Sequence, residues 1–216
     1  MSFIANLKIR NKSLLMLLLP IVGMLYFATI DTIDNYKKST YLEGLKVLVE
    51  YGDQASNLAH EIQKERGMSG GFIGSKGKKF ASKLPTQRSK VDQQLAQMKD
   101  FLGGFNPKNY DQIFQKRFRD AINELNDLGS KRDAVSRLNI SFKDAIAYYT
   151  SVISNLLNSI RELTLYADSP QDIRISLILI NLQQIQEKGG IERAMLSGAF
   201  GVGHFAPGGY DKFSSL

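Results

Sequence analysis

The first strongly apolar stretch of the chain lies close to its N-terminus. Residues 13–30 read SLLMLLLPIVGMLYFATI and carry no charged side chain. An uncharged run of this length is at the lower limit for a helix that crosses a hydrocarbon core of about 30 Å. Pro20 is compatible with such a helix, since neighbouring groups can satisfy the freed carbonyl. The pattern predicts a transmembrane helix over residues 13–33.

The charges that flank this stretch predict its orientation. Basic residues precede the run and acidic residues follow it: Lys8, Arg10 and Lys12 before, Asp31 and Asp34 after. Because the basic flank of a membrane helix stays in the cytoplasm, we expect residues 1–12 there. Residues 34–216 then lie outside the cytoplasmic (inner) membrane, in the periplasm or outside the cell. A cleaved signal peptide is the alternative, although no A-x-A-like site follows.

Downstream, apolar positions recur at the three- and four-residue spacing of helices. One face collects Leu45, Leu48, Tyr51, Ala55, Leu58, Ala59 and Ile62. Its helix can continue from the membrane segment and ends near Gly74–Gly77. Further helices are predicted over residues 84–101 and 110–128 (with a break at Gly129), from Ser141 through Leu165, and from Ser169-Pro170 onward. Strand patterns are nearly missing, which predicts an all-α fold: an antiparallel bundle of long helices after one N-terminal transmembrane helix.

Two features near the C-terminus refine this prediction. The run ISLILI at residues 175–180 is apolar on every side and too short to span a bilayer, so we expect it to be buried among other helices. The last residues, YDKFSSL, read as the opening turns of another helix. We therefore expect a sensor domain over residues 34–216 that is truncated at its C-terminal end, within an N-terminal fragment of a longer protein.

Composition argues against catalysis and against metal or cofactor chemistry. The chain has no cysteine and two histidines. His60-Glu61 lacks the second histidine of the H-E-x-x-H zinc motif, and no P-loop or dinucleotide fingerprint occurs. The net charge of +7 includes the three N-terminal bases, so the remainder is mildly basic. This balance suits small anions or a membrane surface better than nucleic acid, and we expect neither enzymatic activity nor nucleic-acid binding.

Two stretches share a pattern that suits anion binding. Residues 63–71 read QKERGMSGG and residues 186–199 read QEKGGIERAMLSGA, so Arg66 and Arg193 each follow a glutamate and precede small residues. Guanidinium is planar and offers paired donors, which allows two arginines from different helices to grip a flat oxyanion. Arg88 and Arg132 add further candidates. The alternative is that Glu65-Arg66 and Glu192-Arg193 form ordinary surface ion pairs.

Several short motifs resemble the nitrate- and nitrite-sensing (NIT) domain. The likeness spans roughly residues 45–210 and rests on the order of its pieces: Gln63-Lys64-Glu65-Arg66-Gly67-Met68-Ser69, Gln87-Arg88 with Asp92, Leu125-x-x-Leu128 with Arg132 and Val135, Tyr148-Tyr149-Thr150, and Glu187-Lys188-Gly189-Gly190-Ile191-Glu192-Arg193-Ala194. The leading segment NLKIRNKSLLMLLLP also resembles the first membrane helix of methyl-accepting chemotaxis receptors.

The resemblance implies an all-helical periplasmic sensor that binds nitrate or nitrite through arginines, which we assign to Arg66, Arg193, Arg88 and Arg132. It further implies signal transduction by a membrane receptor, such as a methyl-accepting chemotaxis protein, that acts as a homodimer through helix displacement. Family members also carry histidine-kinase, cyclic-nucleotide or antitermination outputs. Two alternatives remain: a helical sensor for another small anion such as a carboxylate, and a membrane-anchored interaction module without a small ligand.

Overall fold

The computed structural model describes residues 8–163, 170–205 and 207–215, and every regular element among them is helical. The chain divides into two compact units, Met1–Lys46 and Val47–Leu216. This confirms the predicted all-α class. Each unit is described on its own.

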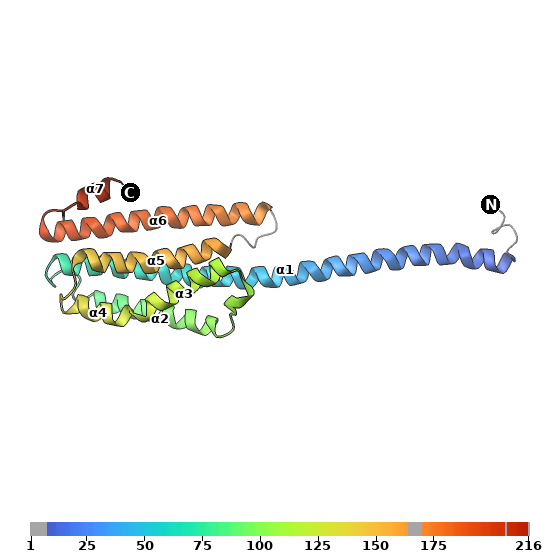
Figure 1. Ribbon diagram of the computed structural model, residues 1–216, viewed down its shortest axis with the longest axis horizontal. Coiled ribbons are helices and arrows are strands. Elements are labelled where there is room, and N and C mark those ends of the chain that lie inside the picture. The colour runs from blue at the N-terminus through green and yellow to red at the C-terminus, as the bar shows by residue number, and fades with distance from the viewer. Residues whose placement is uncertain (1–7, 164–169, 206, 216) are drawn as a thin grey trace. The chain divides into compact units, whose positions relative to one another are not determined.

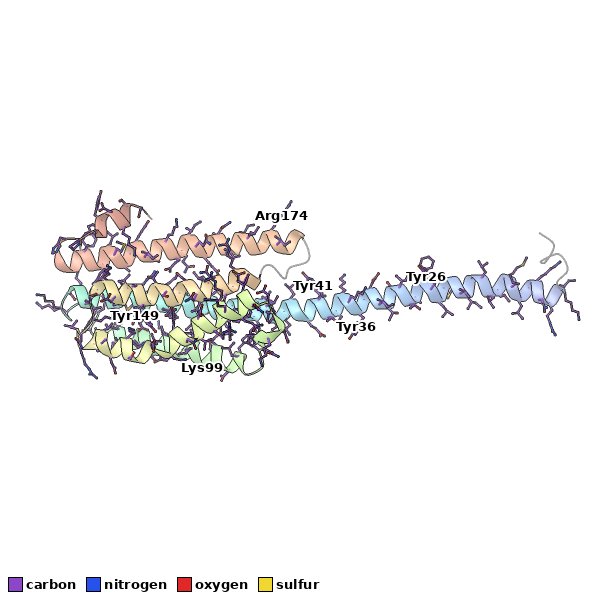
Figure 2. All side chains as sticks on the ribbon, viewed as in Figure 1. Tyr26, Tyr36, Tyr41, Lys99, Tyr149 and Arg174 are labelled. Atoms are coloured by element: carbon purple, nitrogen blue, oxygen red, sulfur yellow. The ribbon has the colours of Figure 1, made fainter. Side chains whose placement is uncertain are left out.

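The first unit consists of the N-terminal part of helix α1 (Ile9–Gly74). Its apolar side chains are exposed, and Tyr26 and Tyr36 are 61% and 75% accessible (Figure 2). The hydroxyls of Thr29 and Thr32 each donate to a carbonyl one turn earlier, at 2.7 Å, which satisfies them without solvent. By length and composition α1 is the one described helix able to cross a membrane, although core helices and signal sequences also pass that test.

The second unit is a helical bundle in which successive long helices reverse direction (Figure 1). The C-terminal part of α1 is followed by α2 (Leu84–Leu102), η1 (Pro107–Asn109), α3 (Gln112–Asn126), α4 (Leu128–Ser136), α5 (Phe142–Leu163), α6 (Pro170–Val202) and α7 (Gly209–Ser214). The predicted helices are therefore present, and the short C-terminal helix appears as α7.

Local capping explains most of the observed boundaries. Asp111 accepts a hydrogen bond from the Phe114 N–H at 2.8 Å, which sets the start of α3. Ser141 accepts one from the Asp144 N–H at 3.0 Å, as its sequence predicted. The predicted break at Gly129 is wrong, because the interruption falls at Asp127 and Gly129 lies inside α4. A helical glycine costs about 1 kcal/mol relative to alanine, which the surrounding packing can offset.

The hydrophobic core joins α1 to α2, α3 and α5. At one end aromatic rings pack together: Tyr51 stacks on Phe105 at 5.3 Å between centroids and meets Phe114 edge-on at 5.7 Å. The Tyr51 hydroxyl and the Ser159 hydroxyl form a buried hydrogen bond of 2.6 Å. These contacts fix α5 antiparallel to α1, and they bring later pairs of the two helices into register.

Helix α6 lies outside this core. No α6 residue belongs to the main cluster of buried apolar side chains among the described residues. Within the apolar run at residues 175–180, Leu177 and Ile178 are 50% and 60% exposed, whereas Ile180 is 7% exposed. The expectation that this run is buried is wrong for Leu177 and Ile178, because α6 packs against its neighbours on one side. The proposed cap residue Ser169 lies outside the described residues.

We expect Phe114→Ala to lower the free energy of unfolding by about 3–4 kcal/mol, since it removes a fully buried ring. The adjacent Ile113 is 57% exposed and provides the control, with Ile113→Ala changing stability by less than about 0.5 kcal/mol. Urea unfolding of the chain in detergent micelles, followed by the circular dichroism signal of its tyrosines, measures the free energy of unfolding of both variants. Equal effects for the two variants would contradict the assigned core.

A second prediction concerns alkaline pH. Burial raises the pKa of Tyr51 from 10.0 to about 12, and the hydrogen bond with Ser159 lowers it by less. The neutral phenol therefore stabilises the fold below about pH 10, and this contribution is lost as the pH rises towards 12. Between about pH 9 and 11 the free energy of unfolding of the wild type should fall by about 1 kcal/mol more than that of Tyr51→Phe. In the control variant Tyr36→Phe, which changes an exposed tyrosine, the free energy of unfolding should fall by as much as in the wild type.

Candidate functional site: a buried arginine between three helices

Two adjacent residues of α1, Glu65 and Arg66, are both fully buried and face different neighbours. Consecutive helical residues point about 100° apart, and α5 presents a matching pair. The Tyr149 hydroxyl donates to Glu65 Oε1 at 2.8 Å, and Arg66 Nη1 donates to Thr150 Oγ1 at 3.0 Å. Glu65-Arg66 is therefore no surface ion pair. Each charge finds its partner on a distant segment.

The partner of Arg66 is Glu187 on α6. Arg66 Nη1 donates to Glu187 Oε1 at 2.5 Å and Nη2 donates to Oε2 at 3.2 Å, so the contact is bidentate. Gln63 Nε2 donates to Oε2 at 2.8 Å. The third guanidinium nitrogen, Nε, is buried without a hydrogen-bond partner among the described residues. A buried donor left unsatisfied is costly, and it indicates capacity for one more acceptor.

A glycine lets α6 approach this guanidinium closely. A Cβ atom on Gly190 would lie 2.8 Å from Arg66 Nη2, whereas one on Gly189 would meet nothing within 4 Å. Further along the same contact, a Cβ on Gly74 would lie 2.9 Å from the Gly198 carbonyl oxygen. Glycines on both helices thus allow α1 and α6 to run parallel with their backbones in close contact.

Arg132 and Arg88 belong to a separate cluster around Glu65. Arg132 donates to both oxygens of Glu65, Nε at 2.8 Å and Nη2 at 2.7 Å, and Nη1 donates to Asp92 Oδ1 at 2.6 Å. Arg88 Nε lies 3.7 Å from Glu65 Oε1. Burial by itself lowers the pKa of Arg132, but its hydrogen bonds with Glu65 and Asp92 raise it above the ordinary value. These two arginines neutralise a buried carboxylate and tie α1 to α2 and α4.

The carboxylate of Glu65 affects the pKa of its hydrogen-bond donor Tyr149. Burial raises the pKa of Tyr149 above its ordinary value, and the nearby Glu65 carboxylate raises it further. The phenol consequently stays neutral and acts as a donor to the carboxylate. The cluster pairs its charges among its own side chains, although Arg88 Nε is buried without a hydrogen-bond partner among the described residues.

Arg193 is exposed on α6, and its Nε donates to the Gly189 carbonyl at 3.2 Å. The two motif-bearing stretches do lie side by side, as the shared pattern predicted. In this alignment Gln63 faces Glu187, so Arg66 faces Gly190, and Arg193 comes nearly one helical turn later. The structure therefore does not bring Arg193 to Arg66.

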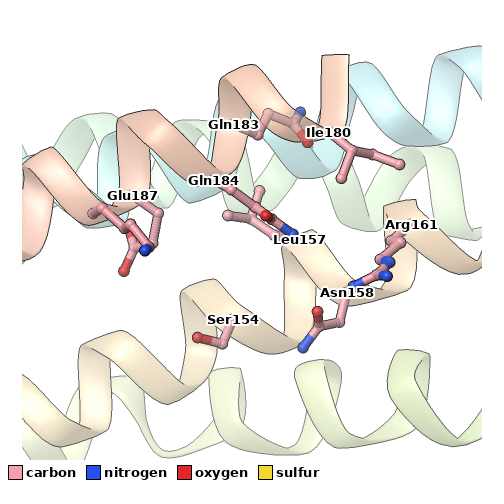
Figure 3. Close-up of a pocket in the computed structure, with 9 residues that line it drawn as sticks. Ser154, Leu157, Asn158, Arg161, Ile180, Gln183, Gln184 and Glu187 are labelled. Atoms are coloured by element: carbon pink, nitrogen blue, oxygen red, sulfur yellow. The ribbon is translucent and has the colours of Figure 1, made fainter. Parts of the chain in front are cut away.

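A cavity of about 180 Å³ opens between α5 and α6 beside this pair (Figure 3). Glu187 is part of its lining, whereas Arg66 is not. The other lining residues are Ser154, Leu157, Asn158, Arg161, Ile180, Gln183, Gln184 and Lys188. One ordered water takes up about 30 Å³ of liquid volume, so the cavity has room for a small ion and several waters. Its amides and basic groups suit a polar, negatively charged guest.

Sequence reasoning proposed Arg66 but missed its partners Glu187 and Thr150, and it missed Gln63, which donates to Glu187. All three stand inside the motifs quoted for the resemblance, yet nothing in their spacing indicates which groups meet. Among the described residues, no group of His, Cys, Asp or Glu could hold a metal ion.

A family model described as nitrate and nitrite sensing (NIT) matches residues 57–216. This chain belongs to the NIT family. A curated relative, the nitrate regulatory protein of Klebsiella oxytoca, is 28% identical over 155 residues, which is 71% of this chain and 38% of the relative. The solved structure of the NasR transcription antiterminator has a TM-score of 0.74 at 24% identity and covers 87% of this chain and 55% of that chain. That likeness shows the fold. The chain thus spans about two fifths of the length of the Klebsiella oxytoca relative and about half of the length of the NasR antiterminator.

Adjacent glycines of this NIT domain provide a test of the site's packing. Gly189→Ala should stabilise the fold by up to about 1 kcal/mol, since a helical alanine is favoured over glycine and has open space. Gly190→Ala should be less stable than Gly189→Ala by about 1–3 kcal/mol, because its methyl group displaces a buried guanidinium. Urea unfolding measures the difference. If both variants gain stability equally, the close approach at Arg66 does not exist.

Proposed function

We propose that this chain is the ligand-sensing region of a bacterial signalling protein and binds nitrate or nitrite at Arg66. The proposal is supported by membership of the nitrate- and nitrite-sensing family. It is also supported by a fully buried arginine that has a donor without a partner among the described residues and whose partner Glu187 lines a cavity. Buried charges in proteins are normally fully paired, so incomplete pairing at Arg66 points to a ligand.

The chemistry of the site suits a flat oxyanion. Nitrate and nitrite present coplanar oxygens, and a guanidinium edge donates two parallel hydrogen bonds to such a pair. Burial strengthens the attraction because the local dielectric is low. Thr150 and Gln63, which already bond to Arg66 and Glu187, are placed to contribute neutral hydrogen bonds.

The membrane context is part of this proposal and rests on the sequence of residues 13–33. In this interpretation residues 1–12 are cytoplasmic, 13–33 span the inner membrane and 34–216 form the periplasmic sensor. The relatives named above are a regulatory protein and a transcription antiterminator, so they lend no support to a methyl-accepting chemotaxis receptor. Chemotaxis output, a homodimer and the absence of nucleic-acid contacts remain predictions.

Signal transmission is proposed to use helix displacement. Helix α6 is held to α1 by polar contacts such as Gln183 Nε2 to Ser56 Oγ at 2.5 Å, and by small residues, with no share in the main apolar cluster among the described residues. A helix held this way can change its packing at low cost in buried apolar area. A ligand that binds one arrangement better than another then shifts the population between them.

A carboxylate ligand is the second candidate. Arg66 holds the carboxylate of Glu187 in bidentate geometry, which shows that this guanidinium accommodates that group. Direct competition between nitrate and small carboxylates separates the two possibilities. If the melting temperature responds to no anion, the chain is an interaction module instead.

Isothermal titration calorimetry of the chain in detergent micelles, with nitrate, nitrite, acetate, sulfate and chloride, tests the proposal. We expect saturable binding of nitrate or nitrite. Arg66→Lys keeps the charge but loses the fork of donors, so it should weaken binding by at least about tenfold. Arg193→Ala should weaken it far less. No saturable heat with either nitrogen oxyanion in a folded sample would refute the proposal.

A further inference from the structure

Glu187 already occupies the position that an oxyanion would take at Arg66. Its carboxylate is a planar group with two equivalent oxygens, and both accept hydrogen bonds from the two terminal nitrogens of Arg66. Glu187 Oε2 also accepts from Gln63. The side chain therefore satisfies the same donors, in the same plane, as a bound nitrate would.

Glu187 also stands between Arg66 and the cavity. It lines the cavity between α5 and α6, where Figure 3 shows it projecting from α6. Arg66 is fully buried and is absent from that lining. A guest in the cavity consequently meets Glu187 first, and it reaches Arg66 only when the carboxylate moves aside.

The two glutamates next to these arginines differ in their surroundings. Each carboxylate accepts three hydrogen bonds, Glu65 from Arg132 and Tyr149 and Glu187 from Arg66 and Gln63, but Glu65 is fully buried. Glu187 is 8% exposed, borders open space and lies on the helix outside the main apolar core. Glu187 can be displaced without opening the core, whereas Glu65 cannot.

We propose that Glu187 is an internal competitor for the anion site, so that an external oxyanion binds Arg66 by displacing this carboxylate into the cavity. The inference rests on the proposed function and adds a residue that sets affinity. The two basic side chains of the cavity lining, Arg161 and Lys188, offer the displaced carboxylate a favourable electrostatic environment.

Internal competition has a measurable cost for the ligand. When only a fraction of molecules has Arg66 available, the apparent dissociation constant exceeds the intrinsic one by the reciprocal of that fraction. It also supplies the switch: displacement breaks the link between Arg66 on α1 and Glu187 on α6, so ligand binding alters the contact between these two helices directly.

The decisive variant is Glu187→Gln, which keeps the shape of the side chain but removes its charge. We expect it to bind nitrate about tenfold more tightly than the wild type, since a neutral amide competes poorly for a guanidinium. Glu192→Gln removes the same charge from the same helix and should leave the dissociation constant within about twofold. In the background of Arg66→Lys, Glu187→Gln should give no comparable gain.

Loss of Glu187 leaves a buried charge unpaired, so the variant is expected to be less stable in chloride. Its melting temperature should then rise more with saturating nitrate than that of the wild type. Glu187→Asp, which withdraws the carboxylate by one methylene, provides a second variant of intermediate affinity.

The outcomes separate this inference from the proposed function. If the wild type binds nitrate and Glu187→Gln binds it equally or more weakly, Glu187 is no competitor while the proposed function stands. If neither the wild type nor any variant binds a nitrogen oxyanion, the proposed function fails as well. Calorimetry and thermal melting of the whole chain in micelles, with nitrate and chloride in parallel, give both readouts.

Discussion

The need to neutralise charge inside a helical bundle governs this structure. Glu65 and Arg66 are adjacent, fully buried and oppositely charged, yet they turn to different neighbours. An isolated charge in such surroundings costs several kcal/mol, which is a large share of a typical domain's net stability, so each charge needs a partner from another helix. Glu65 recruits Arg132 and a tyrosine, and Arg66 recruits Glu187. Four helices are aligned by these few contacts.

The two charged clusters differ in what they can do. Around Glu65 the carboxylate is paired with Arg132 and Tyr149, which joins α1, α4 and α5, although Arg88 Nε has no hydrogen-bond partner among the described residues. Around Arg66 one donor has no partner among the described residues, a cavity adjoins the ion pair, and Glu187 lies on a helix with no described residue in the main apolar cluster. A rigid core beside a weakly held helix is the arrangement that a small ligand can bias at low cost.

The chain belongs to the NIT family, described as nitrate and nitrite sensing, and it spans about two fifths and about half of the lengths of the two relatives named above. The small residues of α1 and α6 acquire a physical role in this context. At Gly74 they bring the two backbones so close that a Cβ atom would meet the Gly198 carbonyl oxygen, and at Gly190 a Cβ atom would meet the Arg66 side chain. Changes in the contact at Arg66 are therefore felt by the backbone of α6.

Sequence alone determined the helical class and most helix boundaries, and it proposed Arg66 as a candidate site residue, because periodicity, capping and side-chain chemistry are local properties. The sequence predicted the interruption at Gly129 instead of Asp127. It also predicted that Leu177 and Ile178 are buried, which is wrong because burial depends on which side of a helix has neighbours. Only the tertiary structure decided which charges meet. The register of α6 on α1 sets Glu187 and Gly190, and not Arg193, opposite Arg66, and that register follows from contacts between segments far apart in the chain.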